Sequence, residues 1–139
     1  MSGTVLDAAD LDAFLAREFP QVCDQIRIEA VAPMTARMRL LCDDRHLRPG
    51  GTVSGPSIML LADVTFYVAI LAMIGPEALT VTTNMTLNFL RKPTKADLLC
   101  DARILKLGRR LVAGDCLLYS AGGSPDAPAA QASVTYARP

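Results

Sequence analysis

The chain is poor in the residues on which metal, redox and nucleic-acid sites depend. Its 139 residues include one histidine, four cysteines and no tryptophan. The cysteines stand at positions 23, 42, 100 and 116, too far apart for the close pairs of a zinc site, and His46 alone cannot supply the missing ligands. Because 14 acidic residues balance 14 basic ones, the net charge of zero gives no general attraction to nucleic acid or to an anionic membrane. We expect no metal ion and no nucleic-acid partner.

A secretory signal is also missing from the first residues. The stretch MSGTVLDAADLDAFLAREF has no cationic segment followed by an apolar one. Cysteines are then expected to stay reduced and to pack as small apolar side chains, so we expect a cytoplasmic protein. Hydrophobic residues make up 51% of the chain and charged residues 20%, which excludes disorder. The length fits a single domain over residues 1–139.

Hydrophobic periodicity indicates a mixed helix and strand architecture. Apolar residues at helical spacing predict an amphipathic helix over residues 7–19, which Asp7 or Asp10 can cap and Pro20 ends. Alternation of apolar and polar residues predicts antiparallel strands at residues 25–31, 35–41, 80–90, 98–107, 110–120 and 129–137. A polar segment rich in Gly and Pro, residues 43–57, separates the second strand from another helix.

That second helix, residues 58–74, is apolar on every face and carries one charge, Asp63. Such a helix either crosses a membrane or is enclosed by protein. A membrane span is disfavoured because the helix would be about 26 Å long against a hydrocarbon core of about 30 Å, and the aspartate would cost about 2.5–3.5 kcal/mol there. We therefore expect an α+β fold in which a curved antiparallel sheet of about six strands wraps the long helix. A second subunit would cover what the sheet leaves bare.

Asp63 and the start of this helix are the candidate chemical groups. A carboxylate among apolar neighbours needs hydrogen bonds or a chemical role, and Asp63 lies two turns beyond the free amides of the helix start. It is either a structural acceptor for amides or a threonine hydroxyl, or a general base or nucleophile. The free N–H groups near Gly55, with Ser54 or Gly55 itself as cap, form either an ordinary helix end or an anion site.

Several stretches of the sequence resemble the hotdog-fold acyl-CoA thioesterases. The run GGTVSGPS at 50–57, continuing to Leu61-Ala62-Asp63, is similar to the family signature G-T-x-H-G-G-x-x-x-x-L-A-D. The strand VTTNMTLNFLR at 81–91 is similar to T-V-x-L-N-I-N-F-L-R, and ARILKLGRR at 102–110 resembles the hairpin that follows it. The likeness covers residues 35–137 and is greatest to the phenylacetate-degradation branch. It implies the same wrapped-helix fold.

The resemblance also implies hydrolysis of an acyl-CoA thioester to a free acid and coenzyme A, with no metal or organic cofactor. Asp63 matches the acidic residue that activates water or attacks the thioester carbonyl, and Gly55 matches the glycine whose N–H polarises that carbonyl. Thr82 matches a serine or threonine that helps to place the water. In the family, the two main groups of one site come from opposite subunits. A homodimer is thus the expected minimum active unit, and a homotetramer is the expected assembly.

The helix start departs from the family pattern. Ser54 and Pro56 replace a histidine and a glycine, and Arg48 stands where many relatives have asparagine near the water. A non-catalytic acyl-CoA or fatty-acyl binding module therefore remains the alternative function. A hydratase is disfavoured because that chemistry usually pairs Asp with His. The expected substrate-binding residues, among which the last two would clamp phosphates, are Ser54, Ser57, Arg48, Asn84, Arg91 and Arg109.

Overall fold

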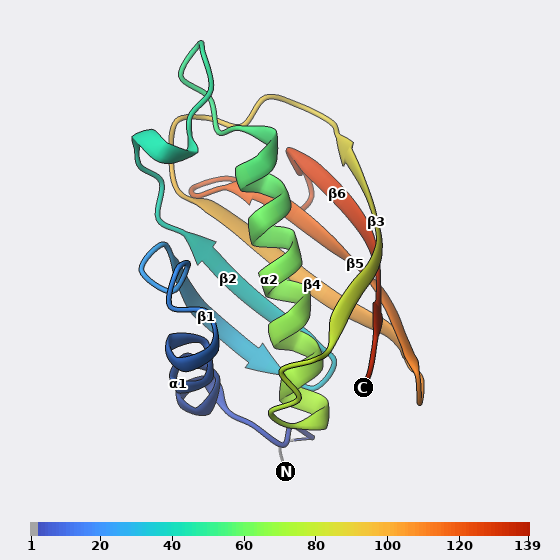
Figure 1. Cartoon of the computed structure of the whole chain (residues 1–139). Helices are drawn as coiled ribbons and strands as arrows, with labels where there is room; N and C mark the ends of the chain where they lie inside the picture. The colour runs from blue at the N-terminus through green and yellow to red at the C-terminus, as the bar shows by residue number, and fades with distance from the viewer. Residues whose placement is uncertain (1–2) are drawn as a thin grey trace.

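The computed structural model describes residues 3–139 and shows a curved sheet around one long helix (Figure 1). The elements are α1 (Ala8–Glu18), β1 (Ile26–Ala32), β2 (Thr35–Leu40), the 3₁₀ turn η1 (Asp44–His46), α2 (Gly55–Ile74), β3 (Val81–Phe89), β4 (Leu98–Leu107), β5 (Leu111–Ser120) and β6 (Ala130–Ala137). All pairs of neighbouring strands are antiparallel, in the order β1-β2-β4-β5-β6-β3. The expected α+β architecture, with a wrapped central helix and an N-terminal helix, is confirmed.

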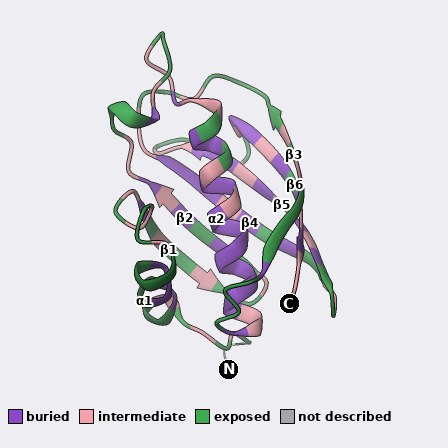
Figure 2. Cartoon of the chain, in the orientation of Figure 1, coloured by how far each residue is buried: buried purple, intermediate pink, exposed green. Residues whose placement is uncertain are grey.

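The core lies between the concave face of the sheet and α2. Phe66, Ile70 and Leu71 of the helix are fully buried, as are Met38 and Leu118 of the sheet. Figure 2 shows the buried residues concentrated along α2 and alternating with less buried residues along the strands. The helix is long and apolar enough to cross a membrane by length and composition, but 72% of its apolar window is buried in the fold. It is therefore the core helix of this domain.

Both helices begin and end where the sequence signals lie. In α1, Asp7 accepts from the Asp10 N–H at 2.8 Å and Asp10 accepts from the Asp7 N–H at 3.0 Å, a capping box that satisfies two helix-start donors. In α2, Ser54 is the cap, and the helix ends at Gly75, whose φ of 100° suits glycine. The predicted strands match the observed ones to within one residue at each end.

The predicted inward facing of Ala30 in the first strand is wrong. Strict alternation in residues 25–31 places Ala30 with Ile26 and Ile28 on the inner face, yet Ala30 is exposed. The register of β1 against β2 shifts between Ile28 and Ala30, and this bulge reverses the facing of the residues that follow it. Val31 therefore packs against the core in place of Ala30.

One stripe of α2 is left uncovered by residues 3–139. Helix α1 lies over its C-terminal half, where the rings of Phe14 and Phe19 lie 6.2 Å and 5.5 Å from that of Tyr67. The N-terminal half has no such cover, and Met59, at 51% exposed, lies one turn before Asp63 on this bare stripe. The sheet and α1 thus leave the helix open beside its one charge.

Candidate active site

Asp63 is held from two strands at one of its carboxylate oxygens. Thr82 of β3 donates its hydroxyl to Asp63 Oδ1 at 2.5 Å, and the Tyr136 hydroxyl of β6 lies 2.5 Å from the same oxygen. The Tyr136 hydroxyl is also 2.7 Å from the main-chain oxygen of Asp63. Within residues 3–139, Asp63 Oδ2 has no hydrogen-bond donor. One oxygen therefore fixes the carboxylate while the other is free to act on a ligand.

The sequence reasoning missed Tyr136. Only its position in the last strand marked it: it follows Ala132 and Val134 at every second residue, so it faces the helix. Its ring packs 5.6 Å from that of Phe66. Thr82 was expected to place a water, but its proton is donated to Asp63, which leaves the hydroxyl oxygen to accept from water. Tyr136 and Thr82 both act on the orientation of Asp63.

A cavity of about 470 Å³, called the Asp63 cavity, is lined by Asp63 together with Thr82 and Tyr136. It lies between α2, the first residues of β3 and the turn after α1. Its wall is largely apolar and is formed chiefly by Phe19, Val22, Leu60, Val64, Tyr67 and Val81. The carboxylate of Asp63 is half-buried at this wall, less enclosed than its apolar neighbours in sequence implied. A carboxylate on an apolar cavity is the setting of many general bases.

The start of α2 provides an unpaired amide. Ser54 Oγ accepts from the Ser57 N–H at 3.3 Å and donates to Ser57 Oγ at 2.9 Å, so both serines serve the cap. Ser57 is buried. The Gly55 N–H has no acceptor within residues 3–139, and Pro56 has no N–H to compete with it. The amide therefore lies at the positive end of the helix dipole and can polarise a carbonyl.

A second cavity, of about 400 Å³, lies at this helix start and is called the helix-start cavity. Gly55 and Phe89 line it together with three cationic residues, Arg48, Arg91 and Lys92. Arg91 donates to the main-chain oxygen of Pro128 at 2.8 Å, which fixes its side chain across the cavity wall. Three cations beside a helix N-terminus form a setting suited to phosphate.

Two expected binding residues lie away from both cavities. Asn84 is exposed on β3, next to the register shift between Thr82 and Asn84. Arg109 is exposed in the turn between β4 and β5, and because β3 and β5 run in the same direction on either side of β6, this turn lies at the end of the sheet opposite Arg91. Within one chain, the structure thus brings Arg48 and Arg91 together but places Arg109 elsewhere. No group of three metal-ligating side chains is close enough to hold a metal within residues 3–139.

Asp63 and Gly55 of one chain stand too far apart to serve one carbonyl. They are eight residues apart on α2, which corresponds to about 12 Å along the helix axis. An attacking oxygen and an oxyanion donor must both lie about 3 Å from a single reacting group. The chain therefore presents two half-sites rather than one complete site.

All three tyrosines should resist ionisation in the folded protein. Burial, with the Asp63 charge and hydrogen bond, raises the pKa of Tyr136 far above its usual value. Burial raises the pKa of Tyr67 to about 12, and burial with a hydrogen bond to Asp101 raises the pKa of Tyr119 to about 12. The native protein should show no tyrosinate absorbance near pH 10, about the pKa of a free tyrosine. In denaturant all three tyrosine hydroxyls should titrate near pH 10.

The same shifts set the direction of alkaline stability. Above about pH 10 the unfolded chain loses tyrosine protons that the folded chain keeps, so the free energy of unfolding falls as pH rises. A spectrophotometric titration checks this, and a native absorbance step near pH 10 would contradict the burial of these hydroxyls.

Comparisons with known proteins agree with this architecture. The sequence profile of the thioesterase superfamily matches residues 50–127. The crystal structure of a candidate thioesterase from a Silicibacter species is 51% identical, covers 98% of this chain and 94% of its own, and superposes with a TM-score of 0.90. No curated protein matches.

More distant structures share the fold. Zebrafish thioesterase superfamily member 2 is 20% identical, with 96% of this chain and 99% of its own covered and a TM-score of 0.83. A mutant of a phenylacetic acid degradation protein from Thermus thermophilus is 21% identical, with 86% and 99% covered and a TM-score of 0.71. The profile match and the Silicibacter relative carry the assignment beyond the fold. The chain belongs to the thioesterase superfamily and is a hotdog-fold thioester hydrolase.

Proposed function

We propose that the protein hydrolyses acyl-CoA thioesters, with Asp63 as the acting acid group and the Gly55 amide as the oxyanion donor. The observation that carries this proposal is the state of Asp63. Two hydroxyls fix Oδ1, while Oδ2 remains unpaired beside an apolar cavity. An unpaired carboxylate oxygen at an apolar wall is available to a ligand that enters the cavity.

The reaction needs few groups. Asp63 Oδ2 either takes a proton from the water that attacks the thioester carbonyl carbon, or attacks that carbon itself and is released by water. The carbonyl oxygen becomes an oxyanion, which the Gly55 N–H stabilises. Collapse of this intermediate breaks the C–S bond and expels the coenzyme A thiolate, which is then protonated. Thr82 and Tyr136 hold Asp63 in place.

The character of the two cavities indicates that they bind different parts of the substrate. The Asp63 cavity is apolar and suits the acyl group. The helix-start cavity carries Arg48, Arg91 and Lys92 and suits the phosphates of coenzyme A. Since each cavity belongs to a different half-site, one substrate would use the acyl cavity of one subunit and the phosphate cavity of its partner.

A homodimer through β3 would bring the half-sites together. Strand β3 is a sheet edge of nine residues, VTTNMTLNF, without the proline or lysine that commonly protects such edges. Its ends carry exposed apolar side chains, among them Val81 at 52% and Phe89 at 59%. Two copies pairing antiparallel along β3 would cover this edge and the bare stripe of α2. A pair of such dimers would give the proposed tetramer.

Thioester choice tests the proposal directly. We expect thiol release from acyl-CoA with a kcat/KM about 100-fold above that for the same acyl group on pantetheine, because two charge-assisted phosphate contacts are lost. The variant Arg91→Ser/Lys92→Ser, which removes two such contacts, should raise KM for acyl-CoA about 100-fold and leave the pantetheine thioester unchanged. Arg17→Ser, on exposed α1, is the matched control. Binding of acyl-CoA without thiol release would establish the binding-module alternative and overturn hydrolysis.

Mixed dimers test the shared site. Gly55→Pro removes the proposed donor, and proline is tolerated at the first helical position. Gly55→Pro and Asp63→Asn homodimers should both be inactive. Unfolding and refolding the two together should restore about a quarter of wild-type activity, since half the dimers are mixed and each has one intact site. No recovery, with mixed dimers shown by mass spectrometry, would place both groups of a site in one chain.

A further inference from the structure

His46, the one histidine of the chain, is buried, at 2% exposed, and has no part in the reaction above. It ends the turn η1. Its Nδ1 lies 3.0 Å from the Asp43 main-chain nitrogen, and its Nε2 lies 2.8 Å from Gln25 Oε1. Because a main-chain N–H can only donate, Nδ1 is the acceptor and Nε2 carries the proton. Both ring nitrogens are therefore paired, in one defined tautomer.

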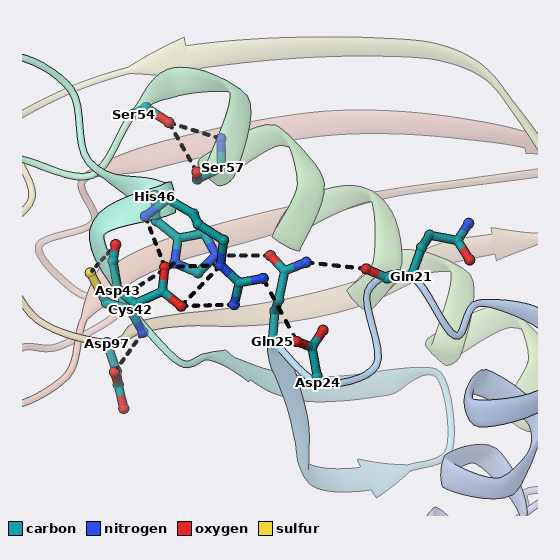
Figure 3. A network of polar contacts seen from close by, with 10 residues as sticks. Gln21, Asp24, Gln25, Cys42, Asp43, His46, Ser54, Ser57 and Asp97 are labelled. Atoms are coloured by element: carbon teal, nitrogen blue, oxygen red, sulfur yellow. Dashed lines mark hydrogen bonds and ion pairs between the residues drawn. The ribbon is translucent and has the colours of Figure 1, made fainter.

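His46 joins three segments that are distant in sequence (Figure 3). Gln25 immediately precedes β1 and also accepts, at its main-chain oxygen, from the Leu41 N–H at 2.8 Å. Asp43 follows β2. The main-chain oxygen of His46 accepts from the Ser54 N–H at 2.7 Å, and Ser54 is the cap of α2. The ring thus fixes His46 to the edge of the sheet, and the main-chain oxygen of His46 carries that position to Ser54, the residue that precedes Gly55.

The segment between His46 and Ser54 is held at its far end by Val53, which is buried in the core directly before Ser54. It is a hairpin-like loop closed by an isolated bridge between Leu47 and Val53, and two glycines with positive φ form its tip. The ion pairs of Arg45 with Asp43 and Asp24 lie at the surface, where such pairs contribute about 0–1 kcal/mol. Buried bonds hold geometry better than exposed pairs do. The His46 ring is accordingly the buried polar anchor at the first end of this loop, and Val53 is the apolar anchor at the other end.

We propose that His46 is a positioning residue that sets the place of the Gly55 N–H through Ser54. The inference rests on the proposed function, in which that N–H stabilises the oxyanion. An oxyanion donor acts only within a narrow range of distance, and a displacement of about 1 Å can cost about 100-fold in rate. Loss of the His46 bonds should therefore lower kcat more than it raises KM, because Arg48 of the same loop is one of three cations at the helix-start cavity.

Two substitutions separate positioning from folding. His46→Leu fills the space but leaves the Asp43 N–H and Gln25 Oε1 unpaired. His46→Asn places an amide oxygen near the position of Nδ1, so the Asp43 N–H keeps its acceptor. We expect kcat to fall about 10- to 100-fold in His46→Leu, with a smaller rise in KM, and to return to within about 10-fold of wild type in His46→Asn, which keeps the Asp43 bond but not the Gln25 bond. Gln25→Leu, which removes the other partner, should lower kcat about 3- to 10-fold and serves if His46→Leu does not fold.

Amide hydrogen exchange supplies a readout without substrate. Peptides spanning residues 43–57 should exchange faster in His46→Leu than in His46→Asn, while peptides from β4 stay unchanged. Equal kcat in wild type, His46→Leu and Gln25→Leu would overturn the proposal. If wild type turns over acyl-CoA and Gly55→Pro does not, equal kcat in the His46 and Gln25 variants overturns only the role of His46 and leaves the proposed function in place. If Gly55→Pro keeps full activity, the proposed function itself fails, whatever the His46 variants do.

Discussion

Asp63→Asn should lower kcat for acyl-CoA hydrolysis about 1,000-fold, within the usual range for loss of a general base. The asparagine oxygen can take the place of Oδ1 and still accept from Thr82 and Tyr136, so the side chain stays in its observed position. The amide nitrogen then replaces Oδ2, and it can neither take a proton from water nor attack a carbonyl. The loss therefore falls on kcat, with KM little changed.

The same experiment excludes indirect causes. Asp126→Asn, in the exposed turn between β5 and β6, removes an equal charge from a residue that lines neither cavity and should keep wild-type kcat. The melting temperature of Asp63→Asn should stay close to that of wild type, since Oδ1 and its bonds are replaced by an isostere. If Asp63→Asn has the same kcat as wild type, the measured hydrolysis does not take place at this site.

The fold was predictable because two signals in the sequence are strong and independent. Alternating apolar residues marked the strands. The run from Ile58 to Ile74 is apolar on every face, so it had to be enclosed by protein. The bulge at Ile28–Ala30 was not predictable, because neither residue carries a bulge signal such as glycine. Exposure of the α2 stripe followed from geometry, since one sheet cannot surround a helix.

The site was predictable only where a residue was anomalous in its own segment. Asp63 is the one charge in an oily helix, and Gly55 lies at a helix start, so both could be named from local sequence. Tyr136 looks like an ordinary inward strand residue, and His46 looks like a loop residue. Their roles arise from partners 73 and 21 residues away in sequence. Contacts of that kind are set by the tertiary fold and carry no local signal.

Gly114→Ala should be among the most destabilising single changes in the core. Gly114 lies on the inner face of β5, and a methyl group there would sit 2.1 Å from the Arg103 main-chain oxygen and 2.6 Å from the Phe66 ring. Contacts that short force the strand pair and the helix apart. We expect a loss of about 3 kcal/mol in the free energy of unfolding, and a melting temperature lower by about 10 °C, measured by circular dichroism.

A second substitution distinguishes the two clashes. Phe66→Leu shortens the side chain and relieves the contact from the helix, but the Arg103 oxygen belongs to the paired strand β4 and cannot move away. Gly114→Ala should therefore stay destabilising in the Phe66→Leu background, with only part of its cost removed. Gly122→Ala, at a φ of 88° in open space, adds the same methyl group without a clash and should cost about 1–2 kcal/mol. A smaller loss for Gly114→Ala than for Gly122→Ala would mean that the sheet and α2 are less closely packed around Gly114 than these distances require.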